Sequence, residues 1–138
     1  MPYLNQLSLR TTLWIDAVAS GATGLLALLG AGPLGDLLDL PATLLRVVGG
    51  FLVPFVIYLV VLATRDVVSR TGAWVVVAFN LIWVAGSILI LVSGQVDPNP
   101  LGYAFVIAQA AAVALFAELQ ATALAREARA GQPNGAMA

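Results

Sequence analysis

Charged and amide side chains are rare in this chain, and those inside its long apolar runs are the residues able to do chemistry. Asp16, Asn80 and Glu118 each interrupt such a run, and Arg65 stands at the end of another. An ionisable group inside a membrane span costs roughly 2.5–3.5 kcal/mol, so each needs a partner or a function. At 1.5 Å per residue the first three lie about 7, 14 and 12 Å from one side of the membrane, and we expect them to cluster. The cluster is either a proton- or cation-linked site or a set of groups that neutralise one another, with Arg65 or with lipid headgroups.

A second group of candidate residues belongs to the other half of the membrane. Gln109 lies nine residues before Glu118, on the opposite face of the same helix, so the two belong to separate sites. Trp83 lies deeper than the other tryptophans and is placed to line an internal pocket. Pro54 follows a Gly-Gly pair and removes a backbone hydrogen bond, which predicts a kink that opens a ligand cavity or improves packing. Arg46 lines the same half or pairs with a nearby carboxylate, for which there are three choices: Asp36, Asp39 and Asp97.

Composition limits the class of protein that can hold these residues. The chain is 61% hydrophobic and 9% charged, whereas soluble domains are about 45–50% apolar and about 25% charged. Without Cys or His, it cannot bind haem or chlorophyll through a histidine, form a thiolate metal site or use a histidine-activated nucleophile. The net charge of −1 provides no basic surface for nucleic acid. We therefore expect a membrane protein that is not an enzyme and has no catalytic residues and no metal.

The apolar runs define four membrane spans of roughly 20 residues or more. They cover about residues 12–31, 41–64, 72–93 and 100–124. We expect a single all-α domain, residues 1–130, folded as an up-down four-helix bundle, and a flexible tail at 131–138. Asn99 and Pro100 are suited to cap and start the last helix, and Asp39 with Pro41 to open the second.

The arginines predict how the bundle is oriented. Five of the six lie on one side of a four-span arrangement: Arg10, Arg65, Arg70, Arg126 and Arg129. By the positive-inside rule, that side and both termini face the cytoplasm. The two halves also share a Ser-Arg-Thr pattern near Ser8 and Ser69 and a Pro-Leu-Gly triplet at Pro33 and Pro100. Either two parallel helical hairpins arose by duplication, or the likeness is chance in a restricted set of residue types.

Small and polar residues mark one face of the first span. Asp16, Ser20, Thr23 and Ala27 follow one another at helical spacing, with Gly24 beside them. Small side chains let helices approach closely in a membrane. We expect this face to pack on the fourth span, on the face formed by Ile107, Ala111, Ala114 and Glu118.

Two resemblances follow from these residues. With an acidic residue in Leu13-Trp14-Ile15-Asp16-Ala17-Val18 and four spans in a short chain, the sequence resembles the small multidrug resistance transporters. It differs from them in its arginine bias and in the shallow position of Asp16. Over most of its length it is similar to small bacterial four-span membrane proteins of unassigned function, through patterns such as Ser20-Gly21-Ala22-Thr23-Gly24 and Asn80-Leu81-Ile82-Trp83. That likeness implies a four-helix fold in the bacterial inner membrane and no activity.

The sequence therefore favours a non-enzymatic membrane bundle. It would be an accessory subunit of a larger membrane complex or would bind a lipid-like or carotenoid-like hydrophobic molecule between its helices. The alternative is a small proton- or cation-coupled transporter that uses Asp16 and Glu118. Membrane lipids are the expected partners, with a larger complex or a homo-oligomer as further ones, and nucleic acid is not.

Overall fold

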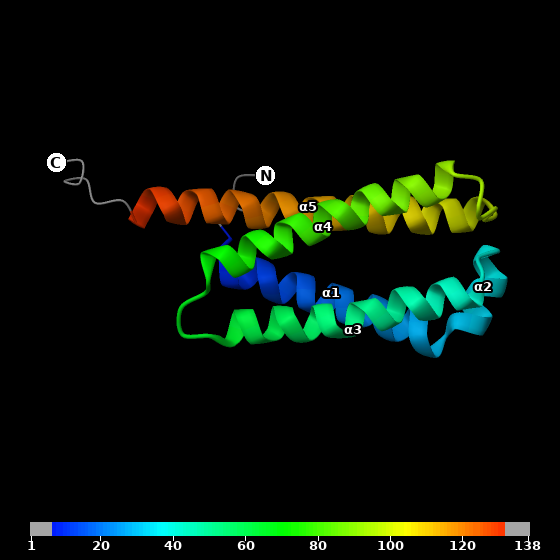
Figure 1. Ribbon diagram of the computed structural model, residues 1–138, viewed down its shortest axis with the longest axis horizontal. Coiled ribbons are helices and arrows are strands. Elements are labelled where there is room, and N and C mark those ends of the chain that lie inside the picture. Colours follow the sequence, from blue (N-terminus) through cyan, green and yellow to red (C-terminus); the bar gives the residue numbers. More distant parts are fainter. Residues whose placement is uncertain (1–6, 132–138) are drawn as a thin grey trace.

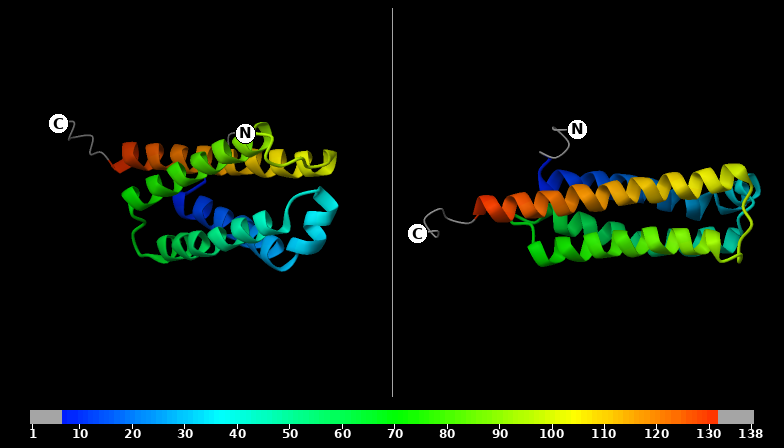
Figure 2. Two further views of the ribbon diagram at one scale, coloured as in Figure 1. Left: turned by 45° about the vertical axis from the view of Figure 1, so that its right-hand side comes forward. Right: turned by 90° about the horizontal axis from the view of Figure 1, so that it is seen from above.

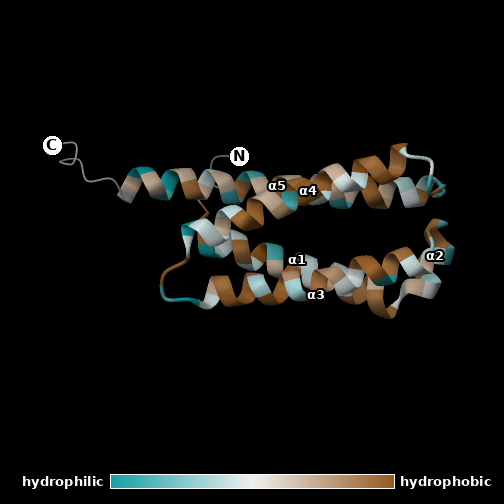
Figure 3. Cartoon of the chain, viewed as in Figure 1, coloured by the Kyte–Doolittle hydropathy of each residue, from teal (hydrophilic) through white to brown (hydrophobic). Residues whose placement is uncertain are grey.

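The computed structural model describes residues 7–131, which are helical apart from short connections and contain no strand. The helices are α1 (Leu9–Leu29), α2 (Ala31–Leu38), α3 (Ala42–Thr64), α4 (Arg70–Val92) and α5 (Pro100–Gly131) (Figure 1). Four of them, α1, α3, α4 and α5, are long and apolar enough to cross a membrane. Hydrophobic residues cover much of their length, and many of the hydrophilic ones lie in the connections (Figure 3). The predicted all-α membrane fold is confirmed.

The long helices alternate in direction and form two layers. In one layer α1 packs on α3, and in the other α4 packs on α5 (Figures 1 and 2). The start of α1, the 65–69 connection and the end of α5 lie together at what we call the loop end, and α2 lies at the opposite end, the α2 end (Figure 1). Contact between α3 and α4 is slight, and the two helices diverge toward the α2 end. Each half of the chain is thus a hairpin of long helices, and the up-down order is as expected.

Three boundaries differ from the predicted spans. The connection between the first two spans contains α2, a helix of 8 residues, and Asp39 ends this helix in the left-handed conformation, with φ 54°, instead of opening the next one. The last helix has 32 residues, about 48 Å at 1.5 Å per residue, so it outruns a hydrocarbon layer of about 30 Å. Of the predicted tail, only Gly131 belongs to the described residues, and it ends α5.

The two layers enclose two hydrophobic cores. The larger lies toward the loop end and includes Leu13, Leu59, Val76 and Leu124, each fully buried. The smaller lies at the α2 end, where α2 folds back on α1 and α3. Asn99 starts α5 as predicted, since its side-chain oxygen accepts the Gly102 amide at 2.8 Å. Its side-chain amide also donates to the Leu37 carbonyl at 2.8 Å, which ties α5 to α2.

The small face of α1 is shared between two helices. Gly24 packs on α3, whereas Asp16 reaches Gln120 of α5, so α1 does contact the fourth span but not through the expected Ile107–Glu118 face. A Cβ added to Gly49 of α3 would lie 2.9 Å from the Gly24 carbonyl oxygen, so the two backbones are nearly in contact. On α5, Ile107 is 57% exposed and Glu118 is also exposed. Small residues permit close backbone approach between helices, and Gly49 of α3 lies where Gly24 of α1 faces it.

Arginines at the loop end bind the backbone carbonyls of neighbouring elements. Arg10 of α1 donates to the carbonyls of Ala63, Arg65 and Asp66, the last two at 2.7 and 3.1 Å. These carbonyls lie at and beyond the end of α3, where a helix leaves its last acceptors unpaired. Two further arginines join other elements in the same way: Arg70 donates to Leu124 and Arg126 to Leu7.

The pattern shared by the two halves has a local explanation. The Ser8 hydroxyl accepts the Thr11 amide at the start of α1, and the Ser69 hydroxyl accepts the Gly72 amide at the start of α4. Serine is a favoured residue at the N-terminus of any helix. The Ser-Arg-Thr likeness therefore has a capping function in each half, whatever its origin.

Candidate functional site

A buried polar cluster joins α1, α4 and α5 in the loop-end half. Asp16 and Gln120 are completely buried, and Asn80 is 2% exposed. One carboxylate oxygen of Asp16 accepts the amides of Asn80 at 2.8 Å and Gln120 at 2.7 Å. The other accepts the Ser20 hydroxyl at 2.8 Å. Asn80 also donates to Gln120 at 3.0 Å, which closes the network.

Two of the four residues predicted for this cluster are elsewhere. Glu118 and Arg65 are exposed, and within residues 7–131 neither is hydrogen-bonded to Asp16. Glu118 precedes Gln120 by two residues, about 200° around a helix, so only one of them can face the interior. The predicted meeting of Asp16 with Asn80 is confirmed, whereas that with Glu118 and Arg65 is not.

Gln120 belongs to the cluster but was not among the predicted site residues. It lies eleven residues after Gln109, close to three helical turns, so both amides fall on one face of α5. Amides inside a membrane need hydrogen-bond partners, and only neighbouring helices supply them. That spacing was the available signal that the glutamine face, rather than the Glu118 face, points into the bundle.

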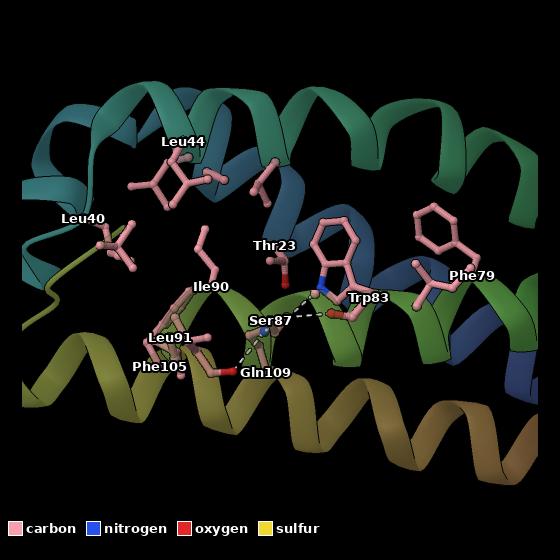
Figure 4. Close-up of a pocket in the computed structure, with 17 residues that line it drawn as sticks. Thr23, Leu40, Leu44, Phe79, Trp83, Ser87, Ile90, Leu91, Phe105 and Gln109 are labelled. Atoms are coloured by element: carbon pink, nitrogen blue, oxygen red, sulfur yellow. Dashed lines mark hydrogen bonds between the residues drawn. The ribbon is translucent and has the colours of Figure 1, made fainter. Parts of the chain in front are cut away.

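A cavity of about 350 Å³ occupies the α2-end half, where α3 and α4 diverge. We call it the lateral cavity (Figure 4). Its lining is mostly aliphatic and aromatic, with Phe79, Trp83 and Ile90 from α4, Leu44 from α3 and Phe105 from α5. Ile82, which also lines it, is 70% exposed, so the cavity reaches the lipid-facing surface.

The polar residues of the lateral cavity are bonded to one another. Trp83 donates its indole N–H to Gln109 at 3.0 Å. The Gln109 side-chain amide donates to the Ser87 hydroxyl and to the Val106 carbonyl, both at 2.9 Å. Trp83 also stacks on Phe79, and Phe79 stacks on Phe55, with ring centroids 5.9 and 4.1 Å apart. Of the residues predicted to line a pocket, Trp83 and Gln109 do so together.

Arg46 and Pro54 lie outside the lateral cavity. Arg46 is exposed on α3, and among residues 7–131 no carboxylate lies within ion-pair distance of it, so the expected pair with Asp36, Asp39 or Asp97 does not form. Pro54 lies within an uninterrupted α3 and lines a shallower hollow against α4, together with Tyr58 and Phe79. The helix α3 therefore continues through Pro54 without a break.

Together, the four apolar helices, the buried polar cluster and the lateral cavity define a multi-pass integral membrane protein of the helical-bundle class. Comparison with protein-family models, with curated proteins and with solved structures finds no match for the chain. The function of the protein is therefore inferred from the site alone.

Proposed function

We propose that this protein binds a lipid-like hydrophobic molecule in the lateral cavity and performs no chemistry on it. The cavity carries this proposal. Its volume of about 350 Å³ is about twice that of an engineered apolar cavity that binds benzene, and it falls in the range of small-molecule sites. No charged residue lines it, so a neutral apolar molecule is the ligand that its surface suits.

The surroundings of the cavity support the same ligand class. It lies between helices that contact lipid, and its exposed lining residues, such as Ile82 and Gly86, provide a route from the bilayer that avoids water. Hydrophobic ligands partition into the bilayer, so a lateral opening faces the phase in which they are concentrated. We place the protein in a bacterial inner membrane with the loop end in the cytoplasm, as the arginine distribution favours.

A pair of glycine variants tests the proposal. A Cβ at Gly86, which lines the cavity, and one at Gly50, which does not, would each meet no atom within 4 Å. Gly86→Leu should therefore fill the cavity without backbone strain, whereas Gly50→Leu should only add a lipid-facing side chain. Native mass spectrometry in mild detergent should show a hydrophobic molecule retained by wild type and by Gly50→Leu, and about tenfold less retained by Gly86→Leu, a change of about 1.4 kcal/mol. Equal retention by both variants would contradict the proposal.

The other two hypotheses receive less support from the geometry. A carrier that uses Asp16 and Glu118 needs both groups in one site, and Glu118 is exposed while Asp16 is fully buried. A function as accessory subunit, in a larger complex or a homo-oligomer, is compatible with the exposed faces of α4 and α5. The same mass spectra would show a second copy or a co-purifying subunit, because they report stoichiometry directly.

A further inference from the structure

The side-chain hydrogen-bond donors of the lateral cavity are all in use. The indole hydrogen of Trp83 and both amide hydrogens of Gln109 are bonded within the site. The Ser87 hydroxyl donates to the Trp83 carbonyl at 2.8 Å, and the Thr23 hydroxyl to the Ala19 carbonyl at 2.9 Å. Each of these side chains has no further hydrogen to donate. A ligand carbonyl, ester or phosphate inside the cavity would therefore lose its water and gain no side-chain donor, which is unfavourable.

The position and length of the cavity match one leaflet. Its lining on α4 extends from Phe79 to Leu91, about 18 Å at 1.5 Å per residue, and half of a hydrocarbon layer is about 15 Å. It lies in the half of the bundle toward α2 and opens sideways to the bilayer. A hydrocarbon chain of the leaflet on that side runs parallel to the same axis, so it can enter while its headgroup stays at the membrane surface.

We propose that the occupant of the lateral cavity is a hydrocarbon chain of a membrane phospholipid, held by its apolar surface alone, with the headgroup outside. This inference rests on the proposed function and narrows it, since it excludes ligands recognised through a polar group. An isoprenoid quinone, for example, would need a free donor for its carbonyl oxygens, and the cavity has none among its side chains.

Trp83 is the natural reporter of the occupant. Replacing the other two tryptophans, by Trp14→Phe and Trp74→Phe, leaves Trp83 as the single indole. A matched reporter retains only Trp74, which is 44% exposed and does not line the cavity. Both are reconstituted in nanodiscs of phosphatidylcholine brominated on one acyl chain, because bromine quenches indole fluorescence on contact. Each is then compared with its Gly86→Leu and Gly50→Leu derivatives.

We expect chain-brominated lipid to quench Trp83, Gly86→Leu to relieve that quenching, and Gly50→Leu to leave it unchanged. Quenching of Trp74 should be the same in all backgrounds. Squalene or an isoprenoid quinone, added at low mole fraction, should not relieve the quenching of Trp83. If either molecule relieved the quenching, the occupant would not be a phospholipid chain, but the proposal that the cavity binds a hydrophobic molecule would still hold. If Gly86→Leu left the quenching of Trp83 unchanged, the lipid chain would lie outside the cavity. The mass spectra would then show independently whether another molecule is bound inside the cavity.

Discussion

Asp16 shows how a carboxylate is accommodated inside a membrane span without an arginine. Its two oxygens accept hydrogen bonds from Ser20, Asn80 and Gln120, at 2.7 to 2.8 Å. An ionised carboxylate is an acceptor only, and amide and hydroxyl donors from three helices meet that requirement. Within residues 7–131 no buried side-chain nitrogen or oxygen lacks a partner. The cluster thereby specifies how α1, α4 and α5 are placed relative to one another.

Removing one hydrogen-bond donor should show how much this cluster contributes to the stability of the protein. Gln120→Leu keeps a similar volume but deletes a donor to Asp16 and an acceptor for Asn80. Interhelical hydrogen bonds in membranes contribute about 0.6 kcal/mol on average and up to about 1.7, and a carboxylate left partly unsatisfied adds to the cost. We expect a loss of about 1–3 kcal/mol, measured as a lower melting temperature in detergent.

Glu118→Leu is the control for that measurement. It removes a charged group two residues away, on the exposed face of α5, so it should leave the melting temperature unchanged or raise it. If Glu118→Leu proved the more damaging of the two, Glu118 rather than Gln120 would be the interior residue and the described cluster would be wrong.

Among the long helices, the most extensive contact is between α1 and α3. Gly24 and Gly49 bring the two backbones together, and a Cβ at Gly49 would also lie 2.7 Å from the Leu28 side chain. Without a hydrophobic effect between lipid-embedded helices, such close packing is what holds them together. The helices α1 and α3 therefore form one closely packed layer. Because α3 makes only slight contact with α4, there is room between these two helices for the lateral cavity.

Adjacent glycines on α3 provide a sharp test of this contact. Gly49→Ala should push the helices apart, because its Cβ would meet the Gly24 carbonyl oxygen at 2.9 Å. Overpacking of this kind costs about 1–3 kcal/mol. Gly50→Ala meets no atom within 4 Å and should gain up to about 1 kcal/mol of helix propensity. Thermal unfolding in one detergent compares the two, and similar melting temperatures would show that α1 and α3 are not in backbone contact.

At the scale of the whole molecule, the arginines of the loop end have two functions. They form the charge bias that predicts orientation, and Arg10, Arg70 and Arg126 also bind carbonyls of neighbouring elements. The opposite end is held differently, by the backbone and side chain of Asn99 on the end of α2. The bundle is therefore tied at both ends around an interior that leaves the lateral cavity open.

Orientation is directly measurable because the chain contains no Cys. Val67→Cys lies in the connection at the loop end and Gln95→Cys in the connection between α4 and α5, and both positions are exposed. An impermeant thiol reagent added to intact cells should label Gln95→Cys and not Val67→Cys, since the arginine-rich end faces the cytoplasm. Permeabilised cells should label both. Labelling of Val67→Cys alone in intact cells would reverse the orientation.

From the sequence alone, the membrane class, the four long helices and their up-down order were predictable. Each depends on local features of the sequence: the length of each apolar run, the number of residues that connect one run to the next, and turn residues such as Asn99 and Pro100. The membrane makes these rules strict, because a backbone without water must satisfy its hydrogen bonds within the helix. Two pairings were predictable for a related reason: that of Asp16 with Asn80, and that of Gln109 with Trp83 in a pocket. Isolated polar groups in apolar spans must form hydrogen bonds with one another.

Helix rotation and pairing were decided only by the tertiary structure. Whether Glu118 or Gln120 faces the interior depends on a rotation of α5 about its axis. The spacing of Gln109 and Gln120 favours the glutamine face, but the contacts of α5 with α1 and α4 decide it. Gly24 could have packed on any neighbour, and the glycine at position 49 of α3 selected the partner. The size and lateral opening of the cavity were not predictable, although Trp83 marked its place, because a void arises where two helices diverge and no single residue encodes the angle between them.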